Sequence, residues 1–291
     1  MSDDGGADLH THTDASDGTV PVAERLRLAR ERGLDTVAIT DHDTISAPLP
    51  TRRALRDGLE IVTGVEVRAD YEGAKIELLG YFVDPTDEQL QALLERVRQY
   101  RHERNEQLVA NLVDETGLDL DYETLEAEAN GTLGRPHLAA RLVEAGLVDS
   151  IGAAFDEYLA EEGSVYVEME RVPYPEVIET LQSAGAVVSL AHPGRIRADA
   201  TAVESMVADL AAVGLDAIEV WYPYGDSHSG GYAGLGVEDA AALAERHDLL
   251  STGGSDCHGP DSGKFRIGDV RVPERAVDAL RERASERRPF E

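Results

Sequence analysis

The stretch Ala7-Asp8-Leu9-His10-Thr11-His12 closes a short apolar segment with two histidines. In an extended strand, residues i and i+2 point to the same side, so both imidazoles can reach one metal ion. Strand-terminal positions converge at one end of a β/α barrel, where enzymes of that architecture place their chemistry. We therefore expect a metal site at the end of this first strand.

Four later predicted strands also end at a histidine or a carboxylate. These strand ends carry His42 after 36–41, Glu66 after 61–65, His192 after 186–191, and the pair Asp256 and His258 after 249–252. Each of these residues taken alone could be a turn or capping residue. Five such strand ends together rarely arise by chance, and histidines and carboxylates are common metal ligands. The pattern therefore predicts a site with several metals.

Strands and helices alternate along most of the chain, which indicates an α/β fold. Expected features include a helix at 21–32, a short helix after Pro50, a hairpin at 67–83 and a last strand at 268–272. From residue 87 to 162 the pattern is helix after helix, with segments at 87–115, 122–129, 136–144 and 151–159. We therefore expect residues 1–86 and 163–291 to form a metal-binding barrel, and residues 87–162 to form a helical insertion that can act as a lid.

The chain is strongly acidic, with 57 Asp and Glu against 27 Lys and Arg and a formal charge of −30. The acids are spread along the sequence, which favours a halophilic surface over a docking face for a basic partner. Such a surface argues against broad nucleic-acid binding, although high salt weakens that argument. The lone Cys257 excludes an intramolecular disulfide, and we expect it to fill space beside the metals. With no signal peptide or membrane-length apolar run, we expect a soluble cytoplasmic protein, and nothing in the sequence identifies a protein partner.

Five blocks of this sequence resemble the PHP (polymerase and histidinol phosphatase) family. They are Asp8–His12, Ile39–Asp43, Gly64–Glu66, Ala191–Pro193 and Gly254–His258. The resemblance implies a distorted seven-stranded, TIM-like β/α barrel with an inserted helical subdomain. Two further blocks, Leu78–Phe82 and Gly134–His137, look most like the stand-alone branch of the family. That branch includes nucleoside 3′,5′-bisphosphate phosphatases and a 5′→3′ exoribonuclease that trims short RNA.

The resemblance also implies two or three divalent metals, with Mn²⁺ favoured and Zn²⁺, Mg²⁺ or Fe²⁺ as alternatives. The first metal would be held by His10, His12, Glu66 and Asp256, the second by Glu66, His192 and Glu77, and the third by Asp17, His42 and His258. The catalytic set would be His10, His12, Glu66, His192 and Asp256.

Glu77 departs from the pattern, because the family often has His at this position. A carboxylate there is a harder ligand than imidazole, so it should shift the preference toward Mn²⁺ or Mg²⁺ and away from Zn²⁺. It could also leave the second position empty at low metal concentration. The alternative is that Glu77 faces solvent on the edge of the hairpin.

The implied substrate is a small phosphorylated molecule, namely a nucleotide or the end of a short RNA or DNA, hydrolysed by a metal-activated hydroxide. Arginines would bind its remaining phosphate oxygens. Candidate binding residues are Arg135 and His137 in the Gly134–His137 block, Arg104 on one helix face with Arg101 and Asn105, Arg195 after His192, and Lys264 after Gly259. Surface salt bridging is the alternative for that helix face and is favoured for Arg101. Rival functions are a histidinol-phosphate phosphatase and, from another class, a regulatory metal-binding module without turnover.

Overall fold

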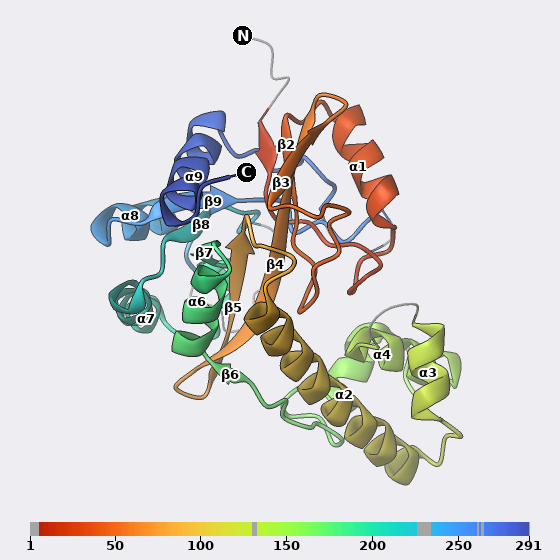
Figure 1. Cartoon of the computed structure of the whole chain (residues 1–291). Helices are drawn as coiled ribbons and strands as arrows, with labels where there is room; N and C mark the ends of the chain where they lie inside the picture. Colours follow the sequence, from red (N-terminus) through yellow and green to blue (C-terminus); the bar gives the residue numbers. More distant parts are fainter. Residues whose placement is uncertain (1–5, 130–132, 226–233, 261, 263–264, 291) are drawn as a thin grey trace. The chain divides into compact units, whose positions relative to one another are not determined.

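The computed structural model describes residues 6–129, 133–225, 234–260, 262 and 265–290. Its strands form one curled sheet with both parallel and antiparallel neighbours (Figure 1). Along the main path of this sheet the strands are β1 (Ala7–Asp8), β2 (Thr36–Ile39), β4 (Leu59–Tyr71), β5 (Ala74–Tyr81), β7 (Val187–Leu190), β8 (Ala217–Trp221) and β9 (Leu250–Gly253). Strands β1, β2 and β4 are parallel to one another, as are β7, β8 and β9. Strand β5 is antiparallel to both of its neighbours.

The first and last strands of this path come together. The Leu9 amide donates to the Gly253 carbonyl over 3.1 Å, and Thr11 forms a parallel bridge with Cys257. Ala7 pairs with Val272 on its other side, although within the described residues the predicted strand at 268–272 is reduced to this bridge. Because β1 and β9 end side by side, the segments that follow them carry their histidines to one place.

A helix predicted after Pro50 is wrong, because residues Arg53–Arg56 form strand β3 antiparallel to β4. The turn between these strands is Asp57-Gly58, whose φ angles are +52° and +79°. Two consecutive positive φ angles are typical of the tight hairpin turn that Asp-Gly favours. The Asp-Gly pair was therefore the sequence signal for a hairpin. A short strand, β6 (Val172–Pro173), pairs parallel to β4 near its end.

Helices pack on the strands of the sheet and bury its apolar side chains. They are α1 (Val22–Glu31), α6 (Tyr174–Ser183), α8 (Val237–Arg246) and α9 (Glu274–Arg287), whereas α7 (Ala200–Val213) packs against α6. The short 3₁₀ turn η2 (Pro193–Arg195) follows β7. Leu79, Tyr81 and Val277 are fully buried in the core between α9 and the strands. Burial of a side chain of Leu or Val size contributes roughly 1.5–3 kcal/mol, so this core holds the strand ends in place.

The chain divides into two compact units, one formed by Met1–Glu95 with Val172–Glu291 and the other by Arg96–Arg171. The second unit contains most of α2 (Glu88–Thr116), together with α3 (Tyr122–Glu128), α4 (Arg135–Glu144), α5 (Ile151–Ala154) and the π-helical turn η1 (Phe155–Leu159). These elements confirm the four helical segments predicted for the middle of the chain. Leu112, Leu138 and Leu159 are fully buried in a core that belongs to this unit.

None of the helices in the described part of the chain combines the length and the apolar character that a membrane crossing requires.

Candidate metal centre

The histidines and carboxylates predicted as metal ligands gather at the strand ends of the first unit. Every one of them belongs to at least one group of three or four side chains whose ligand atoms lie within 4.8 Å of one another. The residues in these groups are His10, His12, Asp17, His42, Glu66, Glu77, His192, Asp256 and His258. Most of them are buried, so the structure brings together the complete set that the sequence predicted.

The first group consists of His10, His12, Glu66 and Asp256. The two Nε2 atoms of His10 and His12 are 3.1 Å apart, and they lie 3.4 and 3.3 Å from Glu66 Oε2. Asp256 Oδ1 lies 3.7 Å from His10 Nε2 and 3.3 Å from His12 Nε2. Ligand atoms bound at about 2.0–2.2 Å in a tetrahedron are about 3.3–3.6 Å apart. The ligand atoms of His10, His12 and Asp256 all lie within 4.8 Å of one another, and Glu66 Oε2 lies at a similar distance from both imidazoles, so this group offers donors to a metal ion.

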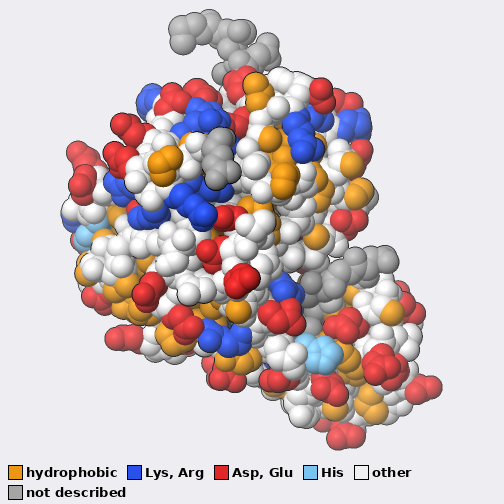
Figure 2. Space-filling view, viewed as in Figure 1, with side chains coloured by type: hydrophobic (Ala, Val, Ile, Leu, Met, Phe, Trp, Pro, Cys, Tyr) orange, Lys and Arg blue, Asp and Glu red, His pale blue; other side chains and the backbone are white. Residues whose placement is uncertain are grey.

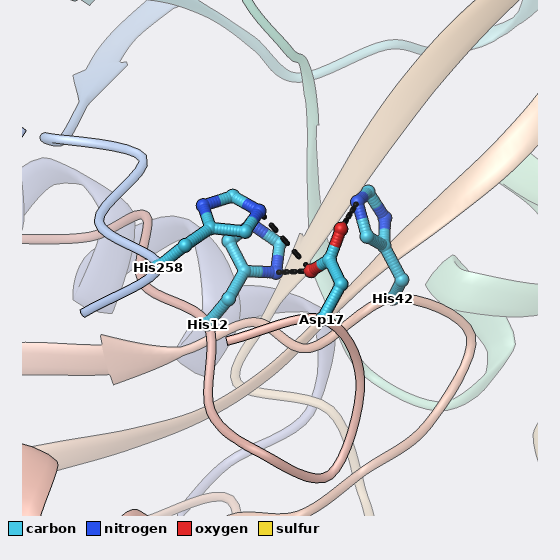
Figure 3. A group of neighbouring side chains, drawn as sticks. All are labelled: His12, Asp17, His42 and His258. Carbon is cyan, nitrogen blue, oxygen red and sulfur yellow. Dashed lines mark ion pairs between the residues drawn. The ribbon is translucent and has the colours of Figure 1, made fainter. Parts of the chain in front are cut away.

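A second group surrounds Asp17, as Figure 3 shows. Asp17 Oδ1 lies 3.1 Å from His258 Nε2 and 3.8 Å from His12 Nδ1, and Asp17 Oδ2 lies 3.7 Å from His42 Nε2. His12 thus faces this group with Nδ1 and the first group with Nε2. The resemblance assigned His12 to one metal only, whereas its ring lies between two candidate positions.

The loop that carries Asp17 is fixed by Asp41, a fully buried carboxylate after β2. Asp41 accepts hydrogen bonds from the Thr13 amide and hydroxyl at 2.7 Å each, and from the Ser16 hydroxyl at 2.6 Å. A buried carboxylate with several such donors is well satisfied and holds the loop rigidly. Asp41 therefore stabilises the loop that carries Asp17, and the candidate metal ligand is its neighbour His42.

The third group contains His192, Glu66 and Glu77, which the resemblance assigns to the second metal. His192 Nε2 lies 3.3 Å from Glu66 Oε1 and 3.5 Å from Glu77 Oε2. Glu77 Oε1, however, is paired with the Arg68 guanidinium at 3.0 Å and with the Lys75 ammonium at 2.9 Å. The Glu77 side chain is only 10% exposed, which rules out the alternative that it merely faces solvent.

The backbone is turned sharply at two of these residues. His192 and Asp256 have φ angles of +28° and +52°, a region that residues other than glycine seldom adopt. Such conformations cost of order 1–3 kcal/mol and persist where the surrounding structure enforces them, commonly at functional sites. Both residues follow a strand directly or within a few positions, and the turn aims each side chain into the cluster.

The charges of the cluster call for additional positive charge. Burial alone lowers the pKa of His10, but Glu219, Glu66 and Asp256 raise it well above its usual value. Burial likewise opposes a charged Glu66, yet the neighbouring histidines hold its pKa well below the usual range. Burial also lowers the pKa of His42 to about 4, so this imidazole is neutral at pH 7 and free to act as a ligand. Divalent cations would satisfy these carboxylates and imidazoles.

Glu219, a fully buried carboxylate on β8, was not predicted from the sequence. Both of its oxygens lie 3.1 Å from His10 Nδ1, and Oε2 also accepts from the His192 amide at 2.9 Å. An ionised carboxylate can only accept here, so it holds a proton on His10 Nδ1. When a metal displaces the other ring proton, Nε2 presents its lone pair to the first group. The signal was the acidic residue inside the otherwise apolar strand Ala217–Trp221.

Glu219→Gln should weaken Mn²⁺ binding by about 10–100-fold, because residues that orient a ligating histidine typically have effects of this size. Competition with a fluorescent chelator measures the affinity. Glu204→Gln, which alters an exposed ion pair with Arg246, serves as the matched control. Equal affinities in wild type and Glu219→Gln would show that Glu219 does not orient His10.

Cys257 is buried as predicted, but it contacts Arg25 instead of facing the clustered ligands. The fully buried Arg25 donates through Nη1 to Cys257 Sγ at 2.8 Å and through Nε to the His12 carbonyl at 3.0 Å. Arg25 therefore ties the segment after β1 to the segment after β9. Tyr222 adds a further contact, since its hydroxyl donates to Asp256 Oδ2 at 3.0 Å.

The predicted substrate-binding residues are distributed over both units. Arg195 ends η2, three residues after His192. Burial raises the pKa of the Tyr222 hydroxyl, and the positive charge of Arg195 partly opposes that rise. Lys264 lies outside the described residues. Arg104, Arg135 and His137 belong to the helical unit.

Within the helical unit, Arg135 and His137 lie in the first turn of α4. Arg135 donates to the Leu159 carbonyl at 3.1 Å, and His137 Nδ1 accepts from the Gly134 amide at 2.9 Å. Arg101 is only 7% exposed, so its interpretation as a surface residue is wrong. Asn105 is also buried, and it donates to the Leu133 carbonyl.

Comparison with known proteins agrees with this geometry. The model of the PHP domain family matches residues 8–172. The chain is 32% identical to a 5′-3′ exoribonuclease of Haemophilus influenzae, over 87% of this chain and 90% of that protein. It is 30% identical to a 3′,5′-nucleoside bisphosphate phosphatase of Chromobacterium violaceum, over 90% of each protein.

Its structure is similar to that of a protein from Bifidobacterium adolescentis described as a metal-dependent phosphoesterase. The TM-score is 0.79 at 29% identity, and the alignment covers 97% of both chains. The match of the family model over more than half of the sequence agrees with the clusters of ligand-type side chains at the strand ends. The chain belongs to the PHP domain family and is a metal-dependent phosphoesterase.

Proposed function

We propose that this phosphoesterase hydrolyses nucleotides or the terminal phosphate ester of short oligonucleotides, with metal ions held by the clustered side chains. The observation that carries the proposal is the convergence of carboxylate oxygens of Glu66 and Asp256 on the Nε2 atoms of His10 and His12, at 3.3–3.7 Å. The nucleotide part of the proposal is supported by the relatives, one of which acts on nucleoside bisphosphates and another on RNA.

Residues around the metal ligands would orient those ligands and bind the substrate phosphate. When bound, divalent ions polarise a phosphoryl oxygen and lower the pKa of water toward neutrality. Glu219 keeps the His10 tautomer that presents Nε2 to the ion, and the Tyr222 hydroxyl fixes the orientation of Asp256. Arg195, three residues after His192, would bind a phosphate oxygen.

The donor atoms also bear on metal identity. The first and second groups mix imidazole nitrogens with carboxylate oxygens and contain no thiolate. Such a set suits Mn²⁺ or Fe²⁺ and accepts Zn²⁺, while the high share of carboxylate leaves Mg²⁺ as a further candidate. We propose Mn²⁺ as the working ion. The non-catalytic alternative is not supported, because both groups retain all of their predicted ligands.

A product analysis tests the substrate class. Wild-type protein with Mn²⁺ in concentrated KCl is given a nucleoside 3′,5′-bisphosphate, a short 5′-phosphorylated RNA or histidinol phosphate, and products are separated by chromatography. A bisphosphatase releases inorganic phosphate, whereas an exoribonuclease releases nucleoside monophosphates from the RNA. Either result supports the proposal. Faster hydrolysis of histidinol phosphate than of both nucleotide substrates would replace it with the rival phosphatase.

Arg135 is proposed to bind a substrate phosphate through two parallel hydrogen bonds, which a lysine cannot reproduce. Arg135→Lys should therefore lower kcat/KM by about tenfold or more and leave the bound metal unchanged. Arg141→Lys on the same helix, where the arginine pairs with surface glutamates, is the control. Wild-type kinetics in Arg135→Lys would return this residue to a purely structural role at the start of α4.

The acidic surface is proposed to be an adaptation to high salt. Figure 2 shows Asp and Glu side chains scattered over the viewed face instead of forming one patch. The charge of −30 implies strong self-repulsion, which is screened over about 3 Å at 1 M salt and about 30 Å at 0.01 M.

The melting temperature and the activity should both rise as KCl approaches molar concentration. Affinity driven by phosphate contacts would instead fall with salt, so thermal unfolding with and without substrate across a KCl series separates the two effects. Equal stability and activity in dilute buffer would contradict the halophilic interpretation and favour a basic partner.

A further inference from the structure

Arg68 is a cation that forms an ion pair with Glu77, a member of the third group. It lies two residues after Glu66 on β4, so both side chains point to the same face of the sheet. Its β-sheet partner across the hairpin is Glu77, and its Nε donates to Glu77 Oε1 at 3.0 Å. The Arg68 side chain is only 16% exposed. No motif of the sequence pointed to this residue.

The ion pairs of Glu77 reduce what the third group can offer to a metal. Arg68 and Lys75 both occupy Glu77 Oε1, which leaves Oε2 as the oxygen toward His192. The formal charges of Glu66 and Glu77 are balanced by those of Arg68 and Lys75. A dication placed there would compete with a guanidinium that is fixed and poorly solvated, and the two like charges would repel each other. The charge of Arg68 also acts on Asp17 and His42 of the second group, but its ion pair is with Glu77 of the third.

We propose that Arg68 takes the place of a metal ion at the third group, so that the chain uses two divalent ions and one guanidinium. The inference rests on the proposed phosphate-ester substrate. The guanidinium, which already neutralises Glu77, supplies the remaining N–H donors to a phosphoryl oxygen of that substrate. Arginine suits this role because its planar array of donors matches phosphate and its charge persists at all physiological pH values.

Counting bound metal tests the first half of the proposal without any substrate. Chelator-treated protein is dialysed against Mn²⁺, and bound Mn²⁺ per chain is measured by mass spectrometry of the metal. Wild type should bind two ions, and Arg68→Gln should bind three, because Glu77 is then released. Lys75→Gln, which alters the half-exposed partner of the same oxygen, should still bind two. Three ions in wild type, or two in Arg68→Gln, would overturn the proposal.

Phosphate binding tests the second half. Arg68→Lys keeps the charge and the count of two ions but loses the paired donors, so the affinity of the Mn²⁺-loaded protein for inorganic phosphate should fall about tenfold by calorimetry. Unchanged affinity would overturn the role of Arg68 toward substrate. If Arg68→Gln does not fold, the wild-type count and the Arg68→Lys affinity still decide. Neither measurement depends on turnover, so a failure of the nucleotide proposal would leave both results interpretable.

Discussion

Asp256→Ala should lower the rate of phosphate-ester hydrolysis by roughly 10³-fold or more, because it removes one of the four donors of the first group. Its Oδ1 atom faces both His10 and His12, and its Oδ2 atom accepts from Tyr222. No other described carboxylate has both of these contacts. The side chain is 15% exposed and apolar packing does not depend on it, so the variant should stay folded.

Circular dichroism and metal analysis, run beside the kinetics, separate loss of a ligand from loss of structure. Asp278→Ala, at an exposed position on α9, is the matched control and should keep wild-type activity. A folded Asp256→Ala protein with near-wild-type activity would exclude Asp256 from the centre.

Removal of all metal should have the other large effect. Ligands of this kind bind metal as neutral imidazoles and carboxylates, so exhaustive chelation should abolish hydrolysis and added Mn²⁺ should restore it. The apo protein should also melt at a lower temperature, because metal binds the folded state and because buried carboxylates such as Glu66 then lose their counter-charge. Parallel measurements of activity and melting temperature during Mn²⁺ titration provide the check. Hydrolysis that persists after chelation would refute metal dependence.

The ligand set could be predicted from the sequence because it depends on local rules. Seven of the nine ligands close or follow a predicted strand, and parallel strands end on one side of a sheet whatever the details of the fold. Asp17 and Glu77 were predicted as ligands only through the resemblance to the PHP family. The His10 and His12 pair and the Asp256 and His258 pair also used the two-residue period of extended backbone. The helices of the middle segment were predicted for a similar reason, because amphipathic periodicity is a property of short windows.

Other features depend on contacts between distant residues, and the sequence did not reveal them. Glu219 contacts His10 across 209 positions of the chain, and nothing near either residue indicates that pairing. The role of Arg68 depends on the register of β4 against β5, which places it opposite Glu77. The helix predicted after Pro50 failed because the Asp57-Gly58 turn, together with pairing to β4, outweighed local propensity.

X-ray diffraction from crystals soaked in Mn²⁺, recorded at the manganese absorption edge, is the most direct test of the proposed metal centre. The anomalous map should show one ion among His10, His12, Glu66 and Asp256, and a second among Asp17, His42 and His258. Ions bound outside these donor atoms, or no bound ion in protein that is active with Mn²⁺, would contradict the assignment of these side chains as the metal centre.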